Sequence, residues 1–152
     1  MIGTEQFYIP ESKELEESIL GAILVEPDCM DDISSILTPD MFHTTLYKVI
    51  YNKISEFYVQ GLTIDIFTVY QALKDRIDEN GGAVMLSSLT AKIASSIRAK
   101  EHALIIRELY ILRYVMNGSL KIYDLIRSKN TLDIVFSELN KLHTDSTNLL
   151  AG

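Results

Sequence analysis

The side chains able to act as nucleophiles or metal ligands are few and widely separated in this sequence. There is one cysteine, Cys29, so the chain forms no internal disulfide and no cysteine-cluster zinc site. The histidines are His43, His102 and His143, and their spacing matches no zinc-binding helix. No pattern brings Cys29 near a histidine as a nucleophile pair. The sequence therefore predicts no catalytic residues, no metal ligands and no enzymatic activity.

A phosphate-binding loop is absent as well. Such a loop needs glycines whose backbone amides surround the phosphates, followed by Gly-Lys-Ser/Thr. None of the seven glycines precedes a lysine. Clustered carboxylates such as Glu14, Glu16 and Glu17 are typical of helix N-termini, where they interact favourably with the helix dipole. We therefore expect no cofactor-binding residues.

Composition narrows the class of protein. The chain has 152 residues, of which 47% are apolar and 23% are charged, so it can form a packed core. Its formal net charge of −7 argues against a protein that mainly binds the nucleic acid backbone. The longest apolar run, residues 19–25, is far too short to cross a membrane, and the N-terminus is unlike a signal peptide. We expect a cytoplasmic protein that does not contact membranes.

Helix breakers are concentrated in the first half of the chain. The prolines are Pro10, Pro27 and Pro39, and no segment alternates apolar and polar residues long enough to predict a strand. The expected fold is all-α, a compact helical globule followed by a long antiparallel helical hairpin. The expected divisions are an N-terminal arm over 1–11, the globule over 12–96 and the hairpin over 97–152. Phe7, Tyr8 and Ile9 are expected to anchor the arm.

Caps and apolar spacing predict the helices of the globule. Ser12 caps the first helix, and Gly21 within it indicates a neighbouring helix at close range. Further helices are expected at about 28–37 and 45–60, after Asp65 as N-cap, and around 85–89. Gly61 is expected to end the 45–60 helix in a left-handed conformation. Predicted core residues are Leu20, Phe42 and Ile50.

From about residue 97 the apolar residues recur every three or four positions. The row consists of Ile105, Leu109, Leu112, Met116, Tyr123 and Ile126. It predicts one helix of roughly 45 Å that continues through Asn117 and Gly118. Asn130 is expected to cap a last helix, and its apolar residues Leu132, Val135, Leu139, Leu142 and Leu149 are expected to pack on this row. The two helices would form an antiparallel hairpin.

Two helices cannot bury all the apolar side chains of this segment, so some are left for another surface. That surface is either the globule or a second copy of the chain. The second alternative predicts a self-association interface with these residues: Leu109, Leu112, Met116, Leu120, Tyr123, Leu125, Leu132, Val135, Leu139 and Leu142.

Charge is distributed unevenly along the chain. Residues 98–129 carry 7 basic and 3 acidic side chains, whereas residues 1–97 carry 6 and 15. The basic helix can either be solvated and ion-paired or line a groove for DNA. We favour the first interpretation, because the whole chain is acidic and would repel phosphate.

Short motifs in order along the chain resemble the N-terminal domain of DnaB-type replicative DNA helicases. That family typically begins with a proline and then a Glu-x-Ser-apolar-Leu-Gly run, here Pro10 and residues 16–21. Other matching segments are residues 37–42, 50–51, 61–65, 68–69, 81–83 and 106–113, with Leu73, Leu86, Leu89 and Ile97. Met85 departs from the family's usual aromatic residue, and Leu46 and Tyr47 stand where Pro and His are frequent. The matches extend from about Pro10 to Arg113.

The resemblance implies a part of a larger machine. In this family the N-terminal domain is a globule plus a hairpin, hairpins pair between subunits, and a trimer of dimers forms a collar on the motor ring. The implied partners are a second copy of the chain, primase and, in some systems, a helicase loader, with DNA contacted only weakly. The implied function is oligomerisation and partner docking in DNA replication. ATP and magnesium would belong to a C-terminal RecA-like ATPase domain that is absent from this chain.

Two alternative functions remain at this point. A free-standing helical adaptor could join or inhibit a helicase ring, and a small DNA-binding protein could use the basic helix 98–129. Coding sequence that continues past Gly152 into a Gly-Lys-Thr/Ser motif would distinguish an excised domain from an adaptor. Steeply salt-dependent DNA binding would favour the last alternative.

Overall fold

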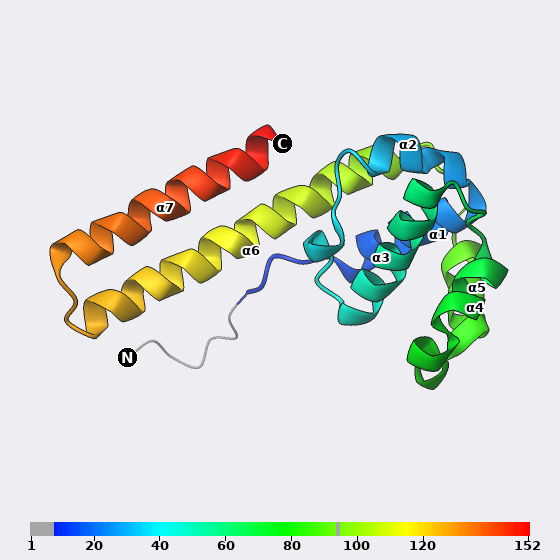
Figure 1. Ribbon diagram of the computed structural model, residues 1–152, viewed down its shortest axis with the longest axis horizontal. Coiled ribbons are helices and arrows are strands. Elements are labelled where there is room, and N and C mark those ends of the chain that lie inside the picture. Colours follow the sequence, from blue (N-terminus) through cyan, green and yellow to red (C-terminus); the bar gives the residue numbers. More distant parts are fainter. Residues whose placement is uncertain (1–7, 94) are drawn as a thin grey trace. The chain divides into compact units, whose positions relative to one another are not determined.

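The computed structural model describes residues 8–93 and 95–152, and over these residues the chain forms helices and no strand (Figure 1). The all-α prediction is confirmed. The chain divides into two units. We call residues 12–107 the globular unit, and residues 108–152 together with arm residues 8–11 the hairpin unit.

The globular unit consists mostly of short helices. They are α1 (Lys13–Val25), η1 (Pro27–Cys29), α2 (Met30–Ile33), η2 (Pro39–Met41), α3 (Thr45–Gln60), α4 (Ile66–Ile77), η3 (Asp78–Asn80) and α5 (Gly82–Ala91). Helix α6 (Ala99–Arg127) begins in this unit and continues into the hairpin unit, which also contains α7 (Leu132–Ala151). The first turns of α6 belong to the globular unit, where Ala99, Ala103 and Ile106 are buried. A boundary between residues 96 and 97 stays a prediction.

Three predicted caps form as expected. The Ser12 hydroxyl accepts a hydrogen bond from the Leu15 amide at 3.3 Å and begins α1. Gly61 ends α3 with φ of 67°, a left-handed conformation that costs glycine little. Asp65 begins α4 with a capping box to Thr68, which satisfies two backbone donors. Helix α6 is continuous through residues 117 and 118, as predicted.

Three local predictions are wrong. The helix expected at 28–37 is only η1 followed by the four residues of α2, because the chain turns after Ile33. Asn130 does not cap α7; its side-chain amide instead donates to the Leu125 carbonyl at the end of α6, 3.0 Å away, and Thr131 takes the N-cap position. Tyr8 and Ile9 are exposed rather than anchors, and Phe7 lies outside the described residues.

The core of the globular unit contains the residues predicted for it. Leu20, Phe42 and Ile50 are each at most 1% exposed. The Phe42 and Tyr51 rings stack with centroids 4.7 Å apart, and the Tyr51 hydroxyl donates to the Leu37 carbonyl at 3.0 Å. Burial raises the pKa of Tyr51 to about 12. A large aromatic pair with its one polar group satisfied therefore fixes the chain between η2 and α3.

Helices α1 and α5 approach each other closely at Gly21, as its position in the sequence predicts. A Cβ atom placed on Gly21 would lie 2.2 Å from the Leu89 carbonyl oxygen. That atom belongs to the backbone of α5 and cannot rotate away. Gly21 therefore sets the distance between these two helices.

Candidate interaction surfaces

Helices α6 and α7 pack antiparallel through a face of α6 that carries a glycine (Figure 1). A Cβ atom on Gly118 would lie 2.3 Å from Cδ1 of Leu142. One turn before Gly118, the Tyr114 hydroxyl donates to Oδ2 of Asp145 at 2.7 Å. One turn after it, Lys121 pairs with Glu138, with Nζ and Oε1 2.7 Å apart. These contacts set the register of the hairpin.

The row expected to pack on α7 lies on a different face, so this expectation is wrong. Each residue turns an α-helix by about 100°, which places Leu112, Tyr123 and Ile126 about 80–140° around α6 from Gly118. Tyr123 is 55% exposed and Ile126 58%. The physical reason is size, because the helices approach most closely where Gly118 leaves room for Leu142.

Helix α7 also carries exposed apolar residues beside its contact with α6. Leu132, Phe136 and Leu139 lie about 60–120° around α7 from Leu142, and Phe136 is 52% exposed. Because the helices are antiparallel, this rotation brings them to the same side of the hairpin as the exposed row of α6. The Lys121–Glu138 pair places Tyr123 and Phe136 at the same level along the hairpin.

We call this side the apolar face of the hairpin. It consists of Leu112, Val115, Tyr123, Ile126, Leu132, Phe136 and Leu139, all exposed. On the opposite side, which we call the polar side, the charged contacts of the hairpin lie beside the exposed Ile134. There the Arg113 guanidinium donates to the Pro10 carbonyl at 2.7 Å and lies 5.9 Å from the Tyr110 ring centroid. The described part of the arm therefore lies on the polar side.

The ten predicted interface residues divide between these surfaces. Four belong to the apolar face: Leu112, Tyr123, Leu132 and Leu139. Leu142 lies against Gly118, and by helical position Leu125 and Val135 also face the partner helix within the hairpin. Leu109 and Met116 are half-buried and Leu120 is exposed, all away from α7. The sequence missed Val115, Ile126 and Phe136 as interface candidates, although the predicted row included Ile126. Their part in self-association stays a prediction.

Most of the basic side chains of helix 98–129 have partners within the protein. Lys100 lies 3.7 Å from Asp32, Arg98 lies 3.9 Å from Glu101, and Lys121 pairs with Glu138 as above. Arg113 binds the arm. Exposed ion pairs contribute little stability, typically under about 1 kcal/mol each. They nevertheless neutralise charge that a DNA groove would need, so the ion-paired interpretation of this helix is favoured.

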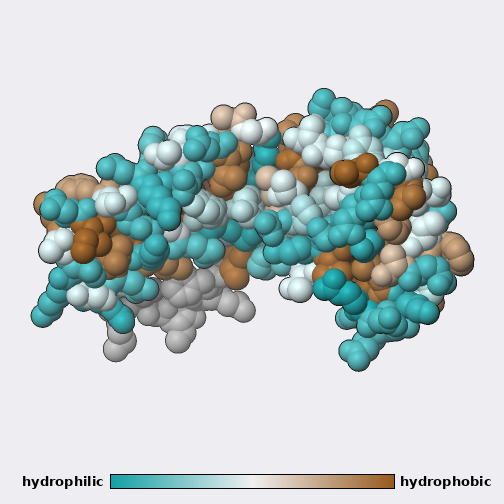
Figure 2. Space-filling model, viewed as in Figure 1, coloured by the Kyte–Doolittle hydropathy of each residue, from teal (hydrophilic) through white to brown (hydrophobic). Residues whose placement is uncertain are grey.

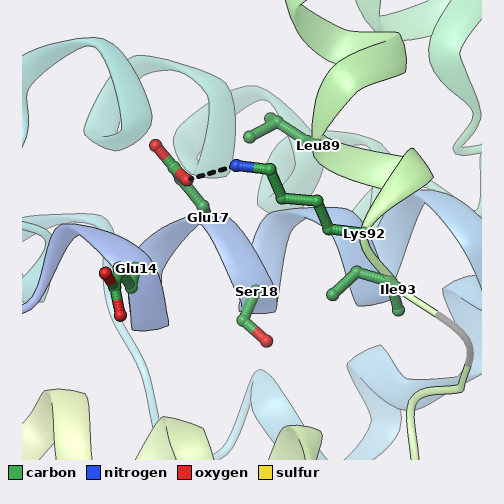
Figure 3. A pocket seen from close by; sticks show the side chains of 6 residues that line it. All are labelled: Glu14, Glu17, Ser18, Leu89, Lys92 and Ile93. Carbon is green, nitrogen blue, oxygen red and sulfur yellow. Dashed lines mark ion pairs between the residues drawn. The ribbon is translucent and has the colours of Figure 1, made fainter.

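The globular unit has a pocket between α1 and the end of α5 (Figure 3). The close view shows Lys92 reaching across toward Glu17, and their charged atoms lie 3.7 Å apart. The Tyr47 hydroxyl donates to the same carboxylate at 2.7 Å. Burial, followed by this hydrogen bond, raises the pKa of Tyr47. Glu17 is thus bound by both Lys92 and Tyr47, and we assign the pocket no chemistry.

The sequence did not reveal the role of Glu16. This carboxylate is 2% exposed, and its two oxygens accept hydrogen bonds from the His43 amide at 2.5 Å and the Thr44 amide at 3.2 Å. Thr44 is the N-cap of α3, and its own side chain makes no capping bond. Glu16 thus caps α3 from α1. Glu16 is the first residue of the Glu-x-Ser-apolar-Leu-Gly run at residues 16–21, and this motif was the sequence feature that could have indicated its role.

No group of histidine, cysteine or carboxylate side chains suited to a metal ion occurs within the described ranges. In the same ranges no helix is long and apolar enough to cross a membrane.

The arrangement of helices matches a known class of domain. A structure of the N-terminal domain of DnaB helicase from Mycobacterium tuberculosis superposes with a TM-score of 0.78 over 88% of this chain and 99% of that one, at 24% identity. A structure of a DnaB-like replicative helicase and its interactions with primase matches 86% of this chain and 31% of that one, with a TM-score of 0.72 and 23% identity. These likenesses establish the fold as that of the helical N-terminal domain.

Sequence comparison then gives the family. The model of the DnaB-like helicase N-terminal domain matches residues 8–108, and the chain belongs to this family. The replicative DNA helicases DnaB of Rhodothermus marinus and Pasteurella multocida are each 32% identical to it, over 108 and 112 residues. The matches cover 70% and 72% of this chain but only 12% and 24% of those relatives. The resemblance inferred from the sequence is confirmed.

Proposed function

We propose that this chain forms the self-associating and partner-docking part of a replicative DNA helicase and performs no catalysis itself. Membership of the DnaB-like N-terminal domain family supports the setting in DNA replication. ATP and magnesium would act in a motor domain outside this chain. The proposed site of action is the cytoplasm.

The observation that carries the proposal is the apolar face of the hairpin. Seven large apolar side chains on two helices are exposed along one side. Contiguous apolar surface of this kind is typical of protein–protein contacts. Figure 2 colours hydrophobic residues brown on the one face of the molecule that it draws. A second hairpin carries the same face, so two copies related by a two-fold axis would cover each other and form a four-helix contact.

The polar side of the hairpin supports a closed dimer rather than a chain of copies. Arg113 and Tyr110 lie there with the arm, and the Lys121–Glu138 pair borders it. A two-fold dimer would cover the apolar face of both copies at once and leave these charged groups outside the contact. Dimers of this kind are the proposed unit from which a trimer of dimers would be built.

Primase is the first proposed partner protein, and a helicase loader the second. The support is one relative of the same fold, a DnaB-like replicative helicase whose structure describes its interactions with primase. A role in DNA binding is not favoured, because four of the seven basic side chains of helix 98–129 already have partners.

Sedimentation of the purified chain at several concentrations tests self-association. We expect a concentration-dependent dimer, and we expect Tyr123→Glu with Phe136→Glu to shift it to monomer, because four negative charges would be buried per dimer. The control is Ser137→Glu with Asn140→Glu, which adds the same charge to exposed positions of α7 outside the apolar face. Leu125 is unsuitable, because by its helical position it faces α7 within one hairpin.

Circular dichroism must show that each variant keeps its helices. A wild-type chain that remains monomeric at its highest soluble concentration would contradict the proposal. Equal dissociation of both double variants would mean that charge, rather than the apolar face, controls association.

A further inference from the structure

A second surface lies in the globular unit, where η1 and α2 meet the end of α3. It is a groove lined by Pro27, Asp28, Asp31, Tyr58, Leu62 and Ile64, which we call the acidic groove. Ile64 is buried at its base, whereas Leu62, just past the end of α3, is 51% exposed. The groove therefore combines an apolar wall with two exposed carboxylates.

Among the residues that the structure describes, no cation pairs with the carboxylates of the acidic groove. Neither Asp28 nor Asp31 forms an ion pair with a described residue, although the nearby Asp32 is paired with Lys100. Oδ1 of Asp31 accepts a hydrogen bond from the neutral Tyr58 hydroxyl at 2.8 Å. No ion pair within the described residues therefore offsets these two carboxylates.

The helix end and the thiol next to the groove both concern its negative charge. Helix α3 ends beside the groove with no basic residue in its last turn, so the negative end of its dipole is not offset there. Cys29 responds to the same field: burial first, then the charges of Glu26, Asp28 and Asp32, raise its thiol pKa to about 11. A positively charged ligand group is the complement of such a site.

We propose that the acidic groove docks a positively charged segment of a partner protein, with an apolar side chain of that segment packing on Leu62. Lysine or arginine side chains would pair with Asp28 and Asp31, and the apolar residue would cover the exposed leucine. This proposal rests on the docking role proposed above and names the chemistry of the partner. The groove belongs to the globular unit, so it is a different surface from the apolar face of the hairpin.

The test uses nitrogen-15 labelled chain and a short blocked peptide with lysines on both sides of a leucine. We expect the peptide to shift the amide resonances of residues 61–64. Replacing Asp28→Asn and Asp31→Asn together should weaken binding about 3- to 10-fold, as expected for the loss of two exposed charge pairs. Leu62→Ser should weaken binding without changing the charge.

The matched control is Asp75→Asn with Glu79→Gln, which removes the same charge from exposed positions on α4 and η3. It should leave the affinity nearly unchanged. An equal loss in both double variants would overturn the proposal in favour of non-specific attraction. Absence of binding, or equal binding of a peptide with glutamates in place of the lysines, would also overturn it.

The two proposals fail independently. Sedimentation of the Asp28→Asn, Asp31→Asn variant should match that of the wild-type chain. If this variant instead loses self-association, a second copy of the chain occupies the groove and the proposed basic partner is wrong. Peptide binding by a chain that never dimerises would contradict the hairpin proposal alone.

Discussion

The Leu142 side chain of α7 fills the space into which a side chain at Gly118 of α6 would extend. The Cβ of any other residue at 118 would lie within 2.3 Å of a Leu142 methyl carbon. This contact turns the Gly118 side of α6 toward α7. The apolar face, on which the proposed self-association depends, therefore lies beside the contact and not within it.

Replacing Gly118 or Gly21 by alanine should destabilise the protein, although alanine in an exposed helix gains about 1 kcal/mol over glycine. The obstacle at Gly118 is a leucine side chain that can rotate, whereas at Gly21 it is the Leu89 backbone carbonyl at 2.2 Å. We expect Gly21→Ala to cost about 2–3 kcal/mol, near the upper end for overpacking, and Gly118→Ala less. Urea denaturation measures both.

The control for the glycine variants is Ser119→Ala, at an exposed position beside Gly118. It should change the free energy of unfolding by less than about 0.5 kcal/mol. Stabilisation by Gly21→Ala would show that α1 and α5 do not approach as closely as described.

Phe42→Ala should cost about 3–5 kcal/mol, because the ring is 1% exposed and stacks on Tyr51. The cavity would lie between η2 and α3 and cannot collapse without moving both. Phe67 is an exposed aromatic residue of α4, so Phe67→Ala is the matched control and should cost under about 1 kcal/mol. A loss below 1 kcal/mol for Phe42→Ala in chemical denaturation would contradict its place in the core.

Glu16→Ala should destabilise the globular unit by about 2–3 kcal/mol, since it leaves the amides of His43 and Thr44 without their acceptor. Glu16→Gln keeps one oxygen acceptor and should cost less. Glu14 is exposed in the same first turn of α1, so Glu14→Ala serves as the control. Similar losses at positions 14 and 16 would indicate a helix-dipole effect rather than a cap on α3.

Stability should fall as the pH rises from about 10 to about 12, in part through Tyr51. Burial raises its pKa from the model-peptide value of 10.0 to about 12 in the folded chain, so between these values the unfolded chain loses the proton first. Tyr51→Phe should reduce the slope of unfolding free energy against pH in this window. An unchanged slope would mean that other tyrosines, such as Tyr47, account for the effect.

The isolated chain should hydrolyse no ATP, with or without single-stranded DNA. The reason is chemical: no Gly-Lys-Ser/Thr sequence is present to hold a triphosphate and its metal ion. The assay measures released phosphate against a heat-inactivated sample. Turnover above that background would contradict the assignment of catalysis to a separate motor domain.

The helix caps could be predicted from the sequence alone. Ser12, Gly61 and Asp65 mark helix ends, because a cap depends on one side chain and the few amides next to it. Asn130 was wrongly predicted to cap α7, because its side-chain amide donates instead to another nearby group, the Leu125 carbonyl at the end of α6. Glu16 was missed because its partners lie 27 and 28 residues away.

The sequence by itself determined the all-α class, the continuous helix through Gly118, the core around Phe42 and membership of the helicase N-terminal domain family. Each depends on spacing or motifs that are local or strictly ordered along the chain. Only the tertiary structure decided which row of α6 packs on α7 and that Asp28 and Asp31 border a groove beside Leu62. Periodicity gives the rows of a helix but not their partners, because close packing is decided by the volume of side chains that meet from distant positions.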